Sequence, residues 1–266
     1  MNIFLRELKT NAKSLIIWCL GMIFLIYAGM VKYSAFSKTG DAVNEFMSQI
    51  PDSMKTVLGI GNGTDVTSVA VFYSMFFLFF MLLAAVHSCM LGALIISKEE
   101  RDKTADFLFV KPIRRSRAIS SKILAAIINI AVLNAVTYAV SVISVEKHNT
   151  GSSLAVPVLM ITSALFILQV LFLGVGLLFG ALAKNSKVAT SAATSIILGT
   201  FILKVIIDMN NDVKAIEFLS PFRYFKADEV MFDRSIDIGY VMVSAAVVLL
   251  CAAGTYIFFQ KRDLRN

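Results

Sequence analysis

Six long stretches of apolar residues alternate with short polar segments along the chain. They cover residues 14–31, 69–96, 123–145, 154–183, 188–207 and 238–259. Each is long enough to cross a hydrocarbon core about 30 Å thick, which takes about 20 residues of α-helix. The polar segments between them are too short for a separate globular domain. We therefore predict a single all-α integral membrane domain over residues 1–266, with six transmembrane helices.

The composition agrees with a membrane protein. Hydrophobic residues make up 58% of the 266 residues and charged residues 16%, whereas soluble proteins contain about 25% charged residues. This argues against a soluble enzyme, a nucleic-acid-binding protein and an ATPase fused to the spans. The net charge of +7 does not indicate nucleic acid, because cytoplasmic loops of membrane proteins carry an excess of lysine and arginine.

The charges are unevenly divided between the two sides of the predicted bundle. Most of the 25 lysines and arginines lie in segments 1–13, 97–122, 184–187 and 261–265, whereas the acidic residues concentrate on the other side. The positive-inside rule places the basic side, with both termini, in the cytoplasm. We expect a multi-pass protein of the cell membrane, surrounded by lipid.

Shorter amphipathic patterns flank the spans. In residues 1–13, apolar side chains recur at helical spacing, with Arg6, Lys9 and Lys13 on another side, which predicts a helix lying in the cytoplasmic interface. The first outer loop, 32–68, shows two short helical patterns, the second of which begins at Pro51. The outer segment 208–237 is acidic but rich in aromatic residues, so we expect it to fold back onto the ends of the helices.

The most charged segment, residues 97–117, links the second and third spans and reads SKEERDKTADFLFVKPIRRSR. Thr104 can cap a short helix, residues 107–110 give that helix an apolar surface, and Pro112 ends it. A short helix at the membrane surface is suited to docking a soluble partner. On charge alone, a loop solvated by water is the simpler interpretation.

The pattern within this loop resembles the signature E-x-E-x-G-T-x-D/E-x-L-L…P-x-x-R of ATP-binding-cassette (ABC) type-2 exporter permeases, also called type V exporters. The resemblance rests on Glu99, Glu100, Thr104, Asp106, Phe107, Leu108, Pro112 and Arg115, with Lys103 at the position of the glycine. Residues 7–18 resemble the connecting helix of that family, and residues 51–60 resemble part of its first outer loop. Together with the six spans, the resemblance covers the whole chain and is closest to NosY-like and multidrug or bacteriocin-immunity permeases.

This resemblance implies a function and a set of partners. Loop 97–117 would contain a short cytoplasmic coupling helix that lies in a groove of a separate ATPase, with Glu99 and Glu100 as ion-pairing or hinge-locking groups. Two ATPase subunits and a second permease, either a copy or a relative, would complete an exporter. The chain contains no G-x-x-x-x-G-K-[ST] motif, so we expect it to be no enzyme, to hold no cofactor, and to leave ATP and Mg to the partner ATPase.

Small residues spaced four apart predict where helices pack closely. They occur at Gly176 and Gly180, at residues 84, 88 and 92, and at Ser191, Ser195 and Gly199. Most such stripes serve packing within one chain. Because spans one and five face the partner permease in the resembled family, we assign the stripe of Ser191, Ser195 and Gly199 to the dimer seam or the translocation route.

Three other functions remain as alternatives. An ion-coupled secondary transporter usually holds a carboxylate within a span, but Glu146 and Asp208 lie at span ends. A membrane sensor or immunity protein without an ATPase is a second alternative. A membrane enzyme is disfavoured because H-E-x-x-H and G-x-S-x-G are absent. No metal site is expected, because His87, Cys89 and Met90 do not share one helical face.

Overall fold

The computed structural model describes residues 3–39, 45–46, 48–57, 65–101, 115–183 and 185–261. Every regular element in these ranges is a helix, and six helices are long and apolar enough to cross a membrane. They are α1 (Ile3–Thr39), α4 (Val69–Arg101), α6 (Arg115–Glu146), α7 (Ala155–Leu182), α8 (Ser186–Met209) and α9 (Ile238–Lys261). The predicted all-α membrane fold with six spanning helices is confirmed.

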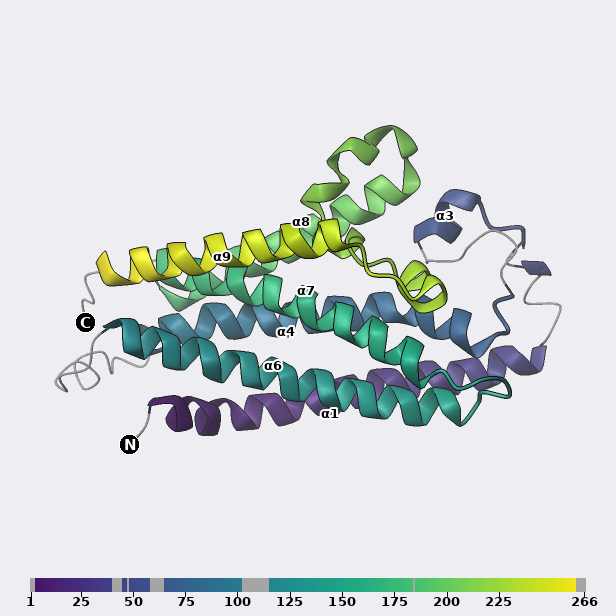
Figure 1. Ribbon diagram of the computed structural model, residues 1–266, viewed down its shortest axis with the longest axis horizontal. Coiled ribbons are helices and arrows are strands. Elements are labelled where there is room, and N and C mark those ends of the chain that lie inside the picture. The colour runs from purple at the N-terminus through teal and green to yellow at the C-terminus, as the bar shows by residue number, and fades with distance from the viewer. Residues whose placement is uncertain are drawn as a thin grey trace.

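The long helices lie alongside one another in an elongated bundle (Figure 1). Helix α1 begins, and α9 ends, at the same end of this bundle, where α4 also ends and α6 begins. We name this the loop end, because segment 97–117 joins α4 to α6 there. The opposite end, which carries α3 (Asp52–Val57) and the segment between α8 and α9, is the far end.

Helix α1 is longer than the span predicted within it. Residues 3–13, for which an interfacial helix is predicted, form the first turns of α1 and continue into the span without a break. The reason is local, because residues 3–20 contain neither glycine nor proline to end the helix. The basic residues at its start therefore belong to the same continuous helix as the first span.

Helices α4 and α7 form the centre of the bundle. In the most apolar 18-residue stretch of each of these two helices, 61% is buried, whereas in α9 the share is 17%. Glycine lets their backbones approach, because a methyl group on Gly176 would lie 2.1 Å from the Cys89 carbonyl oxygen, and one on Gly92 would lie 2.5 Å from the Leu173 carbonyl oxygen. These small-residue stripes are thus used for packing within the chain.

The segment between α8 and α9 folds back onto the far end, as the aromatic residues of segment 208–237 predict. It forms η1 (Asn211–Leu219), η2 (Pro221–Arg223) and η3 (Glu229–Asp233), of which η3 is a single π-helical turn. Phe222 is 1% exposed, and its ring lies 5.2 Å from that of Phe172 and 5.6 Å from that of Phe201. These two ring contacts hold the segment against α7 and α8.

Candidate functional site

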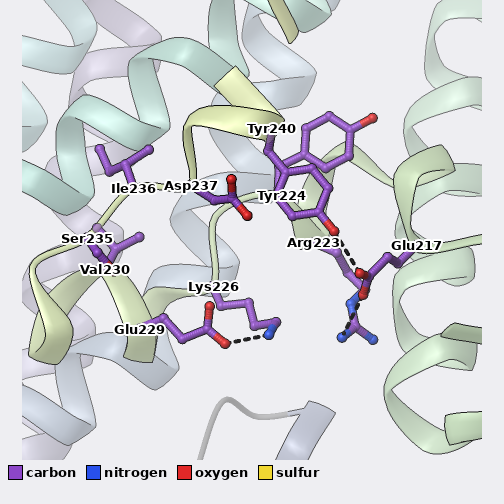
Figure 2. Close-up of a pocket in the computed structure, with 10 residues that line it drawn as sticks. All are labelled: Glu217, Arg223, Tyr224, Lys226, Glu229, Val230, Ser235, Ile236, Asp237 and Tyr240. Atoms are coloured by element: carbon purple, nitrogen blue, oxygen red, sulfur yellow. Dashed lines mark hydrogen bonds and ion pairs between the residues drawn. The ribbon is translucent and has the colours of Figure 1, made fainter. Parts of the chain in front are cut away.

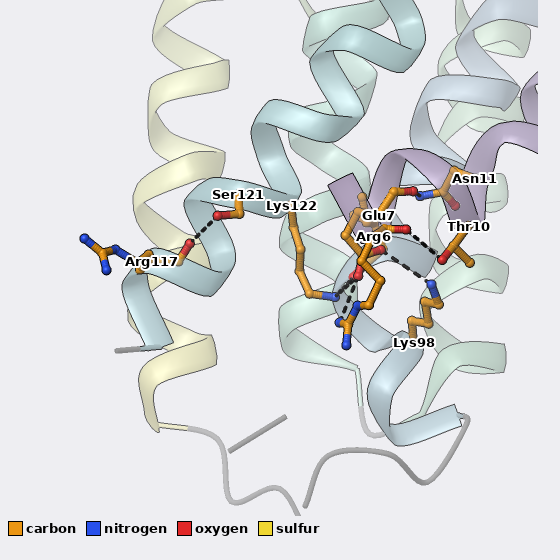
Figure 3. Close-up of polar contacts among 9 residues, drawn as sticks. Arg6, Glu7, Thr10, Asn11, Lys98, Arg117, Ser121 and Lys122 are labelled. Atoms are coloured by element: carbon orange, nitrogen blue, oxygen red, sulfur yellow. Dashed lines mark hydrogen bonds and ion pairs between the residues drawn. The ribbon is translucent and has the colours of Figure 1, made fainter. Parts of the chain in front are cut away.

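A buried carboxylate at the loop end brings three helices together. The Glu7 side chain of α1 is fully buried and is surrounded by three cationic side chains (Figure 3). Glu7 Oε1 lies 3.1 Å from Arg6 Nη2 and 3.9 Å from Lys122 Nζ. Glu7 Oε2 lies 3.5 Å from Lys98 Nζ. We name Arg6, Glu7, Lys98 and Lys122 the Glu7 junction.

The Glu7 junction lies at the base of the charged loop. Lys98 is in the last turn of α4 and Lys122 is near the start of α6. The fully buried Lys122 also donates a hydrogen bond of 2.5 Å to the Ile95 carbonyl oxygen of α4. Because α4 ends at Arg101 and α6 begins at Arg115, both ends of the loop leave from helices that are tied to α1.

A second set of contacts joins the start of α6 to the end of α9. Arg115 Nη1 donates to the Gln260 carbonyl oxygen over 3.0 Å. The Ser120 and Tyr256 hydroxyl oxygens are 2.7 Å apart and share a hydrogen bond. The first turns of α6 are therefore connected by side-chain contacts to α1, α4 and α9.

The predicted loop residues are only partly within the described structure. Thr104, Asp106, Phe107, Leu108 and Pro112 lie outside the described residues, and so does the short helix predicted around them. Glu99 and Glu100 lie in the last turns of α4, but their side chains are not described. Arg115 is the first residue of α6 and makes the contact with α9 given above.

The central residues of this site were not singled out by sequence reasoning. The sequence pattern places Lys98 and Lys122 only among the cytoplasmic charges, and Glu7 only within the segment that resembles a connecting helix. One signal was available, because Lys122 comes directly before an apolar span and Glu7 follows apolar residues at helical spacing. A charge placed next to an apolar face needs a partner when it is buried.

The predicted seam residues lie on the surface of α8. Ser191, Ser195 and Gly199 are all exposed, and a methyl group added to Gly199 would meet no atom within 4 Å. Gly176, in contrast, packs against the backbone of α4 at Cys89. The exposed stripe is thus not used for close packing with the described residues of its own chain.

Polar groups are also buried between α1, α4 and α6. A cavity of about 100 Å³ is lined by Trp18, His87 and Asn129, among others. His87 Nδ1 and Asn129 Oδ1 are buried and make no hydrogen bond with the described part of the chain. That part holds no group of three or more His, Cys, Asp or Glu side chains placed to bind a metal ion.

Comparison with known proteins identifies the family. The chain matches the sequence model of a family described as "ABC-2 family transporter protein" over residues 1–264. No match was found among curated proteins. The matched region contains all six spanning helices, the Glu7 junction and the charged loop. The chain therefore belongs to the ABC-2 family of transporter proteins and is a membrane permease of an ABC transporter.

Proposed function

We propose that this permease is the membrane-spanning part of an ATP-driven exporter, and that the Glu7 junction transmits the movement of separate ATPase subunits to the spans. The observation that supports this most strongly is the position of the junction. It ties α1, α4 and α6 together at the base of the loop that resembles a coupling element. Association with ABC ATPases follows from membership of the family.

Coupling requires a rigid path from the ATPase to the spans. When two ATPase subunits close on ATP and Mg, a loop held by flexible linkers would absorb the motion. Here both helices that bracket the loop are held by charged contacts to a fully buried carboxylate. Pushing on the loop therefore shifts three spanning helices as one body, with α9 attached through Arg115 and Ser120.

The complete exporter pairs two permeases with two ATPases in this proposal. The exposed stripe of Ser191, Ser195 and Gly199 supports α8 as the seam, because small residues allow a partner helix to approach closely. The basic loop end lies in the cytoplasm by the positive-inside rule. The far end is then the outer face, towards which the substrate moves.

Substitution of the apolar loop residues tests the coupling contact. We expect Phe107→Asp with Leu108→Asp to reduce co-purification of the ATPase at least about tenfold, because two buried apolar contacts contribute more than 1.4 kcal/mol. Phe218→Asp is the matched control, because Phe218 is 54% exposed and lies in η1 at the far end. Unchanged ATPase association in the double variant, with normal membrane insertion, would contradict the coupling-helix assignment.

A further inference from the structure

A cavity of about 460 Å³ lies at the far end, between the fold-back segment and the first turn of α9 (Figure 2). Its volume falls within the range of about 300–1,000 Å³ that is typical of small-molecule sites. The residues that decide its chemistry are Glu217, Arg223, Tyr224, Lys226, Asp237 and Tyr240. They come from η1, from η2 and the residues after it, and from the start of α9.

The charges around the cavity leave one carboxylate without a cation. Arg223 is paired with Asp208, at 2.9 Å, and with Glu217, at 3.5 Å. Lys226 is paired with Glu229 at 2.5 Å. Asp237 accepts a hydrogen bond of 2.7 Å from the Gly239 backbone N–H, and it makes no ion pair with the described residues. Every lining cation is therefore neutralised, and Asp237 adds a net negative charge.

Two tyrosine rings form an aromatic wall beside this carboxylate. The rings of Tyr224 and Tyr240 are stacked, with centroids 4.8 Å apart and planes 12° apart. Their hydroxyl groups are already used, since Tyr240 donates to Glu217 Oε1 over 2.7 Å and Tyr224 donates to the Phe218 carbonyl oxygen. Figure 2 shows the two rings next to each other, with Asp237 at their side. Aromatic faces near a carboxylate attract a cation.

Arg223 offers no free charge to the cavity. Its side chain is 7% exposed, and its Nη1 and Nη2 atoms pair with Asp208 and Glu217. The charged group of the lining that remains open to a ligand is therefore the exposed Asp237, with the two tyrosine rings beside it.

We propose that this cavity binds an organic ammonium compound, with its ammonium group against Asp237 and the rings of Tyr224 and Tyr240. The ligand is either a free ammonium compound or the ammonium headgroup of a lipid in the adjacent leaflet. This inference goes beyond the proposed function, because binding at the far end requires neither an ATPase nor a direction of transport.

The test measures choline binding to the purified permease in phosphatidylglycerol nanodiscs without ATPase, by isothermal titration calorimetry. We expect saturable binding of choline, and binding at least fivefold weaker for 3,3-dimethyl-1-butanol, its uncharged isostere. Asp237→Asn should weaken choline binding about fivefold, the upper end of the effect of an exposed charge pair. Asparagine also caps helices, so the start of α9 is preserved.

Asp233→Asn is the matched control, because Asp233 is exposed on the same segment but does not line the cavity. It should leave choline affinity within twofold of the parent protein. Nanodiscs that contain phosphatidylcholine identify the source of the ligand. If these lipids abolish choline binding, the natural ligand is a lipid headgroup, and if binding persists, it is a free ammonium compound.

Three results would overturn the proposal: no saturable choline binding in phosphatidylglycerol, equal affinity for choline and its uncharged isostere, or unchanged affinity in Asp237→Asn. None of them bears on ATP coupling, because no ATPase is present. The failure of this site and the failure of the proposed function are thus distinguishable.

Discussion

Replacement of Glu7 by glutamine should destabilise the loop end of the bundle. The substitution keeps the size of the side chain but removes the negative charge that faces three cations. Arg6 and Lys98 keep contact with water, because their side chains are 36% and 17% exposed. Lys122 keeps no contact with water, because its side chain is fully buried. The cost of the substitution is therefore mainly the loss of the buried charge contact between Glu7 and Lys122.

The magnitude follows from the geometry. Opposite unit charges at about 4 Å attract by roughly 4 kcal/mol at an effective dielectric constant of about 20, and Lys122 Nζ lies 3.9 Å from the Glu7 carboxylate. Lys122 retains its hydrogen bond to the Ile95 carbonyl oxygen, which reduces the loss. Removing one partner of a buried pair costs about 3–5 kcal/mol. We expect Glu7→Gln to lower the free energy of unfolding by about 3 kcal/mol.

A double-mutant cycle isolates the charge contact. Lys122→Met should cost less, about 1 kcal/mol, because Glu7 keeps two other cations. The double variant should be more stable than Glu7→Gln alone, with a coupling energy of about 2 kcal/mol. The assay is unfolding of the purified permease by sodium dodecyl sulfate, followed by circular dichroism.

The control for this cycle is Glu229→Gln, which removes the same charge from the exposed pair with Lys226. It should change the free energy of unfolding by about 1 kcal/mol or less. The reasoning would be refuted by additive effects of Glu7→Gln and Lys122→Met, or by a Glu7→Gln effect as small as that of the exposed control.

Three other predictions follow from the structure. Gly176→Ala should cost about 3 kcal/mol in the same unfolding assay, because the new methyl group meets the Cys89 carbonyl oxygen. The control is Gly21→Ala, which should not destabilise the protein, because its methyl group meets no atom within 4 Å. Gly199→Leu should abolish the paired permease in native mass spectrometry without lowering the stability of the protomer; an intact pair would remove α8 from the seam. Burial raises the pKa of the Tyr224 phenol above 10, so the folded protein keeps a proton that the unfolded chain loses. This stabilisation is present below pH 10 and is lost as the pH rises through the raised pKa. Tyr224→Phe should therefore reduce the fall in the free energy of unfolding between pH 9 and pH 11.

The spanning helices could be predicted because their signal is local. A run of about 20 apolar residues has few alternatives to a transmembrane helix, and the described part of the chain contains six such helices. The continuity of α1 was not predicted. The amphipathic pattern of residues 1–13 suggested a separate interfacial helix, but nothing in residues 3–20 interrupts the backbone hydrogen bonds.

The Glu7 junction could not be found by local reasoning. Its members lie on three helices, and Lys98 is 91 positions from Glu7 along the chain. A count of charges places both lysines correctly among the basic residues of one end, but it does not show that both contact the same carboxylate. Only the packing of α1 against α4 and α6 brings these side chains together.

The far end was predicted in kind but not in detail. The aromatic residues of segment 208–237 indicated that it folds back, and Phe222 does so between Phe172 and Phe201. The stacking of Tyr224 on Tyr240 depends on where α9 begins relative to η2. A sequence pattern does not give the position of the start of α9 relative to η2, so the cavity beside Asp237 can be seen only in the structure.

The measurement that tests the central claim most directly is affinity purification of the tagged permease from its native membrane in mild detergent, with mass spectrometry of the proteins that accompany it. An ATP-coupled permease predicts a stoichiometric partner that carries a nucleotide-binding G-x-x-x-x-G-K-[ST] motif. Repeated recovery of an intact complex without such a partner would contradict ATP-driven transport.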